Sequence, residues 1–133
     1  MGTERYKLTD KTAVVTGSSS GIGKAIAKKF AGAGANVVVC APEDEQDNMD
    51  DVVASINQAD HQGQAVSTPC DVTDRSTVEA LAETTVKEFG EIDVLVNNAG
   101  GGLPSPFRNL NMESWDKIVD LNLGGTFICS PSI

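Results

Sequence analysis

The sequence is poor in the side chains that form metal centres and disulfide frameworks. It has one histidine, His61, and three cysteines, Cys40, Cys70 and Cys129, which are odd in number and widely spaced. This pattern fits neither a zinc site nor a set of disulfides, so we expect no metal and no disulfide. Cys40 and Cys70 fall at the ends of predicted strands and can lie near each other, and we expect buried, inert thiols there.

Basic residues are also scarce. Ten lysine and arginine residues stand against 19 aspartate and glutamate residues, which gives a net charge of −9. Nucleic acids and anionic membranes bind cationic surfaces, so we expect neither as a partner. No stretch approaches the roughly 18 consecutive apolar residues of a membrane span, and the polar start MGTERYKLTDK lacks the apolar core of a secretion signal. We therefore expect a cytoplasmic protein.

The stretch TAVVTGSSSGIGKAI at residues 12–26 predicts a buried strand, a glycine-rich turn and the start of a helix. The apolar run AVV suits a strand covered on both faces. Ile22, Ile26 and Phe30 recur every four residues, as one apolar stripe of a helix does. A helix N-terminus presents unpaired N–H groups and the positive end of the helix dipole. The natural ligand of this turn is therefore a phosphate group.

Three known motifs could describe the glycine-rich turn. A P-loop needs a glycine at position 18 and a serine or threonine at position 25, and the sequence has Ser18 and Ala25 there, so we reject it. A nucleophile elbow, G-x-S-x-G, would make Ser19 the nucleophile of a hydrolase. Its histidine could only be His61, which has no motif around it, and no earlier strand is present to build an oxyanion loop. This hypothesis is therefore weak.

The third motif is a dinucleotide-binding turn. Gly17, Gly21 and Gly23 give the spacing G-x-x-x-G-x-G, which is one residue longer in its first gap than the usual fingerprint. Small residues at these positions would also allow tight packing of a helix on a sheet without any ligand. Signals elsewhere in the chain decide between the two.

Strands and helices alternate along the rest of the chain. Residues 36–40, 64–69 and 94–97 predict further strands, and apolar stripes predict helices over residues 49–59, 74–90 and from about 112. Asp74 is a candidate N-cap and Gly90 a helix stop, an acidic loop follows Pro42, and Pro131 is expected to break the last helix. Strands alternating with helices of this length predict βαβ units and a parallel sheet with right-handed crossovers.

Short motifs at the strand ends carry a resemblance to a known family. The third strand closes on Asp71-Val72-Thr73, the fourth on NNAG at residues 97–100, and Asn122 begins the pattern N-x-x-G-x-F on the last helix. Together with TGSSSGIG, these motifs stand in the order and spacing of the short-chain dehydrogenase/reductase family. The sequence closely resembles this family from about residue 8 to residue 129.

The resemblance implies a Rossmann-type fold, an α/β doubly wound parallel sheet. The family's sheet has the strand order 3-2-1-4-5-6-7, of which this chain would supply 3-2-1-4. Residues 1–133 would then be the N-terminal part of a single NAD(P)-binding Rossmann domain, truncated relative to homo-oligomeric full-length relatives. The apolar fourth strand would become an exposed edge, and we expect marginal stability or self-association through it.

The resemblance also implies which residues bind the dinucleotide. The turn wraps the pyrophosphate, with Ser19 and Ile22 lining it. Asp71 contacts the adenine amino group, Val72 lies beside the ring, and Asn98 with its neighbours lines the nicotinamide-side ribose. Asn122 matches the catalytic asparagine, which in the family interrupts its helix and holds a water in a proton relay; the alternative is a helix side chain bonded to backbone. The implied cofactor-binding residues are Gly17, Ser19, Ser20, Gly21, Ile22, Gly23, Ala41, Asp71, Val72, Asn98, Ala99 and Gly100.

The choice between NAD and NADP is made at the end of the second strand. A carboxylate there binds the ribose 2′-hydroxyl and an arginine binds the 2′-phosphate, but the sequence has Ala41 and Pro42. Ser20 stands where NADP-preferring relatives often carry a basic residue, and the acidic run that starts at Glu43 would repel a 2′-phosphate. We therefore expect NAD rather than NADP.

The family's catalytic serine and its Tyr-x-x-x-Lys pair, which follow the asparagine by some two dozen residues or more, have no match here. The only tyrosine is Tyr6, and Lys117 precedes Asn122. Without the tyrosine no general acid protonates the carbonyl as the hydride arrives. The expected function is an NAD(P)-dependent oxidoreductase acting on an alcohol or carbonyl substrate, inactive as given. The alternative is a dinucleotide-binding module or inactive remnant without catalysis.

Overall fold

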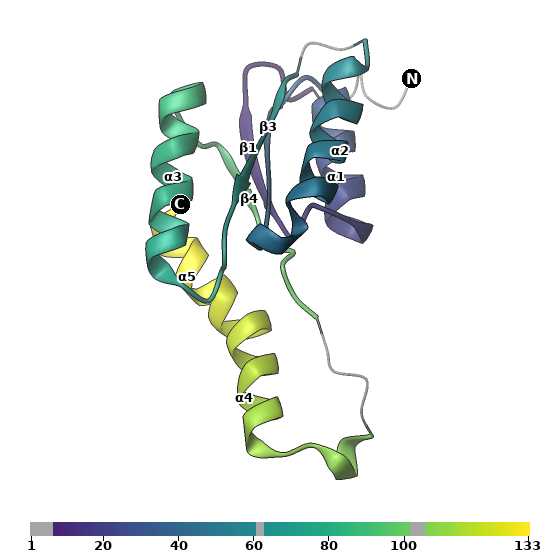
Figure 1. Cartoon of the computed structure of the whole chain (residues 1–133). Helices are drawn as coiled ribbons and strands as arrows, with labels where there is room; N and C mark the ends of the chain where they lie inside the picture. The colour runs from purple at the N-terminus through teal and green to yellow at the C-terminus, as the bar shows by residue number, and fades with distance from the viewer. Residues whose placement is uncertain (1–6, 61–62, 102–105) are drawn as a thin grey trace.

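Figure 1 shows the computed structural model, which describes residues 7–60, 63–101 and 106–133. Strands alternate with helices, as the apolar runs predict. The strands are β1 (Thr12–Thr16), β2 (Asn36–Ala41), β3 (Ala65–Pro69) and β4 (Val94–Val96). The helices are α1 (Gly21–Gly32), α2 (Gln46–Gln58), α3 (Arg75–Phe89), α4 (Met112–Val119) and α5 (Gly125–Ser132), with the 3₁₀ turns η1 (Glu43–Glu45) and η2 (Phe107–Asn109) and the π-helical segment η3 (Asp120–Gly124).

The strands form one parallel sheet in the order β3-β2-β1-β4, which confirms the predicted order 3-2-1-4. Val14 of β1 lies opposite Val38 of β2 on one side and Leu95 of β4 on the other. The chain moves outward from β1 to β2 and β3, and then returns to place β4 on the other side of β1. The direction of winding therefore reverses between β1 and β4, and α/β sheets bind ligands at the carboxyl ends of the strands at such a point.

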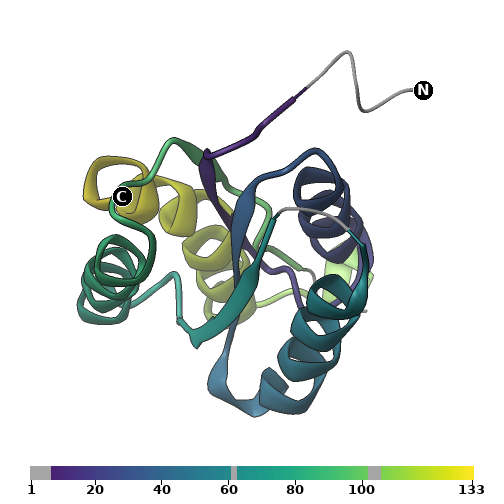
Figure 2. The ribbon, with the colours of Figure 1, turned by 90° about the horizontal axis from the view of Figure 1, so that it is seen from above.

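Helices cover both faces of the sheet. α1 and α2 lie on one face and α3 and α5 on the other, as Figure 1 shows from the side and Figure 2 from above. Successive strand side chains alternate between the faces: Val15, Val37 and Val39 pack with α1 and α2, whereas Val14 and Val38 pack with α3 and α5. All five are completely buried, so β1 and β2 are covered on both faces, as their apolar runs predict.

The ends of α3 match their sequence signals. Asp74 is its N-cap, and the carboxylate Oδ1 accepts hydrogen bonds from the Ser76 N–H at 3.0 Å and the Ser76 hydroxyl at 2.7 Å. These bonds lower the pKa of the Asp74 carboxyl, because they stabilise its charged form. Gly90 ends the helix with a φ of +93°, which glycine adopts without the steric cost of a side chain.

Two expectations about the helices are wrong. Ile22 does not belong to the apolar stripe, because it is 73% exposed whereas Ile26 and Phe30 pack against the core. It lies in the first turn of α1, at the end of the sheet where the strands finish, and not alongside the strands. Pro131 does not break the last helix but lies inside α5. Only Ser132 follows it within the helix, so the missing N–H weakens just the final turn.

Helix α4 projects away from the sheet at the end where the strands finish (Figure 1). Four large apolar side chains along α4, η3 and α5 are at least half exposed: Met112, Trp115, Leu123 and Phe127. Among the residues that the structure describes, no helix is long and apolar enough to cross a membrane.

Candidate functional site

A cavity of about 290 Å³ opens at the carboxyl ends of the strands, between the turn after β1 and the segments that follow β2 and β3. The predicted cofactor-binding residues that line it are Gly17, Ser19, Ser20, Ala41, Asp71, Val72, Ala99 and Gly100. The predicted residues Gly21, Ile22, Gly23 and Asn98 are not part of the lining, nor is Asn122. The structure therefore brings together most of the predicted residues, which come from segments as much as 83 positions apart, from Gly17 to Gly100.

Ser18 fixes the glycine-rich turn to the end of β2. Its hydroxyl donates to the Val15 carbonyl at 2.7 Å and accepts from the Cys40 N–H at 3.0 Å. Its own N–H donates to the Cys40 carbonyl at 3.1 Å. The sequence alone indicates for Ser18 only that the turn is not a P-loop. Its contacts show that it holds the wall of the cavity in place.

Two of the glycines are required by packing within the protein. Gly17 has a φ of +63°, and a Cβ there would lie 2.9 Å from the Ala99 Cα. A Cβ at Gly23 would overlap the Gly17 carbonyl and the Asn98 side chain. Tight packing of the turn against the segment after β4 thus accounts for both glycines without a ligand. Only the polar groups around the cavity can therefore indicate a ligand.

The N-terminus of α1 offers such groups. Ser20 occupies the N-cap position with extended backbone, yet its side chain makes no capping hydrogen bond, and no acidic residue lies in the first turn. Serine at this position usually satisfies one of the free N–H groups of the first turn. Within the described part of the chain these donors have no side-chain partner, and they are suited to a phosphate.

Thr16 joins the ends of β1 and β4 through its buried hydroxyl. The Oγ1 donates to the Val96 carbonyl at 3.2 Å and accepts from the N–H groups of Asn98 and Ala99, each at 2.9 Å. The Asn98 side chain in turn donates to the Gly17 carbonyl at 3.1 Å. The predicted ribose-binding segment is therefore held against the glycine-rich turn, and Asn98 acts there as a packing and hydrogen-bonding partner.

Asp71 lies in a hydrogen-bonded turn just after β3. Its Oδ1 accepts from the Thr73 N–H at 2.9 Å and from the Thr73 hydroxyl at 2.6 Å. The Thr77 hydroxyl accepts a hydrogen bond from the Asp71 N–H at 3.0 Å and donates one to the Asp71 carbonyl at 2.6 Å. The second carboxylate oxygen, Oδ2, takes part in none of the hydrogen bonds among the described residues, so it is free to accept one from a ligand.

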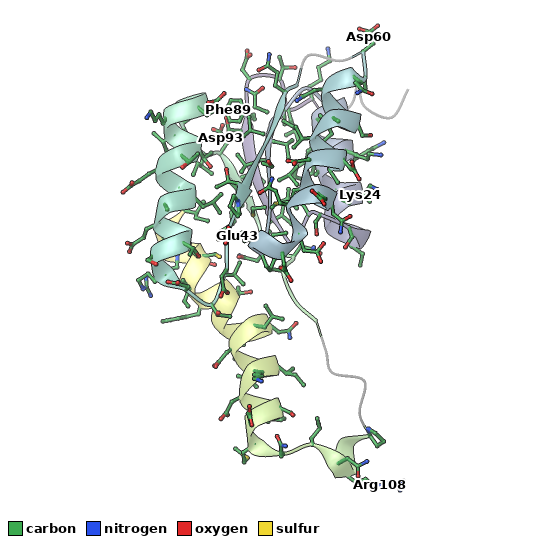
Figure 3. All side chains as sticks on the ribbon, in the orientation of Figure 1. Lys24, Glu43, Asp60, Phe89, Asp93 and Arg108 are labelled. Atoms are coloured by element: carbon green, nitrogen blue, oxygen red, sulfur yellow. The ribbon has the colours of Figure 1, made fainter. Side chains whose placement is uncertain are left out.

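The acidic run after β2 is not the open loop that the sequence suggests. Its first three residues form the 3₁₀ turn η1, closed by a hydrogen bond from the Glu45 N–H to the Pro42 carbonyl at 2.9 Å. This turn brings Asp44 and Glu45 into the lining of the cavity. Figure 3 shows Glu43, the first residue of η1, at the same end of the sheet. Neither Asp44 nor Glu45 was predicted as a site residue.

The three cysteines are free and lie buried in one cluster. The expected burial of Cys40 and Cys70 is confirmed. Cys40 and Cys70 also form part of the cavity lining, and the Cys40 thiol donates to the Val15 carbonyl at 3.3 Å. Burial raises the pKa of the Cys40 and Cys70 thiols and raises that of Cys129 to about 11. Since the thiolate is the reactive form, these side chains are poor nucleophiles.

Asn122 lies in the π-helical segment η3, an interruption of the kind that the family resemblance implies. Its side chain is occupied by backbone groups: Nδ2 donates to the carbonyls of Gly101 at 2.8 Å and Ile118 at 2.9 Å, and Oδ1 accepts from the Gly101 N–H at 3.2 Å. The alternative expectation, a side chain bonded to backbone, therefore also describes it. These contacts fix the segment after β4 onto the helix.

His61, the histidine of the hydrolase hypothesis, and Tyr6 lie outside the described residues. Ser19 lines the cavity. In the part of the chain that the structure covers, no three His, Cys, Asp or Glu side chains are grouped so as to hold a metal ion.

A parallel sheet wound in this order, with a glycine-rich turn leading into the N-terminus of α1, is the architecture of a dinucleotide-binding domain. The model of the short chain dehydrogenase family matches residues 11–133. The chain therefore belongs to the short-chain dehydrogenase family.

Curated proteins of known sequence are similar to this chain. Glucose 1-dehydrogenase 2 of Bacillus subtilis is 42% identical over 125 residues, which cover 92% of this chain and 47% of the relative. The 7alpha-hydroxysteroid dehydrogenase of Escherichia coli is 40% identical over 124 residues, 93% of this chain and 47% of the relative. The chain thus spans about half the length of the curated relatives that it matches.

Solved structures show the same relationship. A hydroxysteroid dehydrogenase from Escherichia coli superposes with a TM-score of 0.86 at 40% identity, over 96% of this chain and 52% of that structure. A dehydrogenase/reductase from Sinorhizobium meliloti superposes with a TM-score of 0.88 at 35% identity, over 95% of this chain and 49% of that structure. These matches confirm the Rossmann-type fold expected from the sequence.

Proposed function

We propose that the cavity binds the adenosine half of a nicotinamide dinucleotide, with the pyrophosphate at the N-terminus of α1. The observation that carries this proposal is the uncapped first turn of α1, which adjoins a cavity at the point where the winding of the sheet reverses. The cavity, at about 290 Å³, lies at the lower end of the ~300–1,000 Å³ usual for ligand pockets. That size suits one half of a dinucleotide.

Each predicted residue has a role in this proposal. The turn from Gly17 to Gly23 receives the pyrophosphate, and the exposed side chain of Ile22 covers it from the solvent side. The free Oδ2 of Asp71 accepts a hydrogen bond from the adenine amino group, with Val72 against the ring. The segment from Asn98 to Gly100 borders the nicotinamide-side ribose.

NAD is the proposed cofactor in preference to NADP. No lysine or arginine lines the cavity in the described residues, whereas three carboxylates do: Asp44, Glu45 and Asp71. The 2′-phosphate of NADP would meet only like charges there, which costs about 1 kcal/mol per pair of unit charges 4 Å apart in water.

The proposed reaction is hydride transfer between the nicotinamide and an alcohol or carbonyl group of a small molecule. The cofactor supplies or receives the hydride, and this chain binds and orients it. Asn122 is the proposed counterpart of the family's catalytic asparagine, and its contacts with Gly101 and Ile118 hold its helix in the interrupted form. Residues 1–133 are proposed to be the N-terminal part of a single dinucleotide-binding domain, in the cytoplasm.

The sequence contains no Tyr-x-x-x-Lys, since Tyr6 is its only tyrosine and Asp10 stands at the lysine position. We therefore propose that this chain by itself binds the dinucleotide without turning over substrate. The second candidate function is a module that only binds nucleotide. A longer chain that carries the Tyr-x-x-x-Lys pair distinguishes the two: it would reduce carbonyl compounds under the first function and would not under the second.

Titration with NADH, followed by nicotinamide fluorescence, tests the binding. Gly21 is the most informative position, because a Cβ there meets nothing within 4 Å and its φ is +58°. Gly21→Asp and Gly21→Asn share the same backbone strain and nearly the same shape, and only Asp adds a negative charge beside the pyrophosphate. We expect Asp to weaken NADH binding about tenfold more than Asn, from one like-charge contact of about 1 kcal/mol or slightly more.

Three results decide the matter. Saturable binding with that difference, and no oxidation of NADH by carbonyl compounds, supports the proposal. Equal binding of NADH by the two variants would show that the pyrophosphate does not lie at the N-terminus of α1. Failure of the unaltered chain to bind either NADH or NADPH would contradict the function as a whole.

A further inference from the structure

We propose that Asp44, carried by η1, selects NAD over NADP by accepting the ribose hydroxyl groups of the adenosine half. It would replace the carboxylate that is absent from the end of β2. The assignment rests on the proposed function, because it concerns the same cavity.

The end of β2 itself has no polar side chain for a ribose. Ala41 and Pro42 both line the cavity, and neither offers a hydrogen-bond donor or acceptor beyond its backbone. Pro42 has a φ of −56° and is the residue from which η1 starts. Its carbonyl accepts from the Glu45 N–H at 2.9 Å, so the chain folds back on itself at once. This reversal places residue 44 at the cavity although it stands three positions after the strand.

The three acids of η1 differ in what they contact. Glu43 does not line the cavity. Glu45 does, but its Oε2 accepts from the Asn48 side chain at 2.7 Å and its side chain is half-buried. Asp44 lines the cavity, is exposed, and takes part in no hydrogen bond or ion pair among the described residues. Asp44 is therefore the carboxylate that can turn both of its oxygens to a ligand.

A free carboxylate suits a ribose and opposes a phosphate. Its two oxygens are acceptors only, and the neighbouring 2′- and 3′-hydroxyl groups of a ribose supply two donors. A 2′-phosphate presents mainly acceptor oxygens at neutral pH and carries a charge of about −1.5 to −2, as phosphate esters do. Asp44 and Glu45 would both repel it, and no lysine or arginine in the described lining offsets them.

The test compares two isosteric variants of neighbouring carboxylates. Asp44→Asn removes the charge of the carboxylate that lines the cavity, and Glu43→Gln removes the charge of one that does not. For each chain the dissociation constants of NADH and NADPH are measured under the same salt conditions. Both positions are exposed, and the cooperativity of thermal unfolding verifies that each variant is folded.

We expect the unaltered chain to bind NADH at least tenfold more tightly than NADPH. Asp44→Asn should reduce that ratio about tenfold or more, through weaker NADH binding and tighter NADPH binding, as one carboxylate facing about two phosphate charges implies. Glu43→Gln should change the ratio less than threefold. Repeating the titrations with AMP and adenosine 2′,5′-bisphosphate should give the same order, because the discrimination lies in the adenosine half.

If Asp44→Asn changes the ratio no more than Glu43→Gln does, the assignment to Asp44 is overturned, while dinucleotide binding stands. If the unaltered chain binds neither cofactor, the proposed function falls and the assignment falls with it. A preference for NADPH in the unaltered chain would also overturn the assignment.

Discussion

The Thr16 hydroxyl joins the ends of β1 and β4 beside the cavity. The loss of stability that follows its removal can be predicted from its contacts. Thr16 is 1% exposed. Replacement by valine keeps the shape of the side chain and deletes the oxygen. The Ala99 N–H then has no partner, and the Asn98 N–H keeps only its 3.1 Å contact with the Val96 carbonyl.

The size of the effect follows from these contacts. A buried donor left without a partner costs about 1–3 kcal/mol, and weakening a second hydrogen bond costs about 0.5–1.5 kcal/mol. Thr16→Val should therefore destabilise the chain by about 2–4 kcal/mol. Thr16→Ser is the matched control, because it keeps the oxygen and loses a methyl group at a cost of about 1 kcal/mol.

Urea unfolding followed by circular dichroism measures both changes by linear extrapolation. The order of stability should be unaltered chain, Thr16→Ser, Thr16→Val. The valine variant should also bind NADH more weakly, because Ala99 and Gly100 line the β4 side of the cavity and the Thr16 hydroxyl bonds the Ala99 N–H. If Thr16→Val is as stable as Thr16→Ser, with an unchanged dependence on urea, the hydroxyl does not hold these segments together.

Two further predictions concern stability and association. Folding raises the pKa of Cys129 from 9.0 to about 11, so the folded state favours the protonated thiol. Its contribution is complete below about pH 9 and is lost as the pH rises through about 11. The midpoint of thermal unfolding should fall over that range, and by less in Cys129→Ala; an equal fall in both chains would show that this thiol is not responsible. The chain should also self-associate, because β4 pairs with β1 only among the described strands and large apolar side chains of α4 to α5 are exposed. Light scattering should give a mass that rises with protein concentration, and a constant monomer mass would refute this.

The arrangement of the sheet was predictable because its signals are local and repeated. Each apolar run bounded by glycine, proline or a cap marks a strand or helix, and the alternation of the two determines a parallel sheet. The cap at Asp74 and the stop at Gly90 follow from the chemistry of single residues. The family motifs then supplied the strand order and most of the cavity lining.

The features that the sequence alone does not predict depend on contacts between distant segments or on the geometry of a local turn. Thr16 bonds residues 82 and 83 positions away, and an ordinary threonine at a strand end gives no signal of that. Ile22 has the spacing of a core residue, but its burial depends on where α1 meets the sheet. In the sequence Asp44 is one acid within an acidic run and has no distinguishing signal. Only the 3₁₀ turn after Pro42 makes Asp44 line the cavity while its neighbour Glu43 does not.

The proposed dinucleotide site is tested most directly by mapping where NAD⁺ contacts the chain, by following the backbone amide signals in an NMR titration. We expect saturable shifts for the turn from Gly17 to Gly23, for Asp44 and for Asp71 and Val72, with little change at exposed positions of α3 such as Lys87. Shifts confined to other surfaces, or no saturable shift at millimolar NAD⁺, would contradict the claim that this cavity is a dinucleotide site.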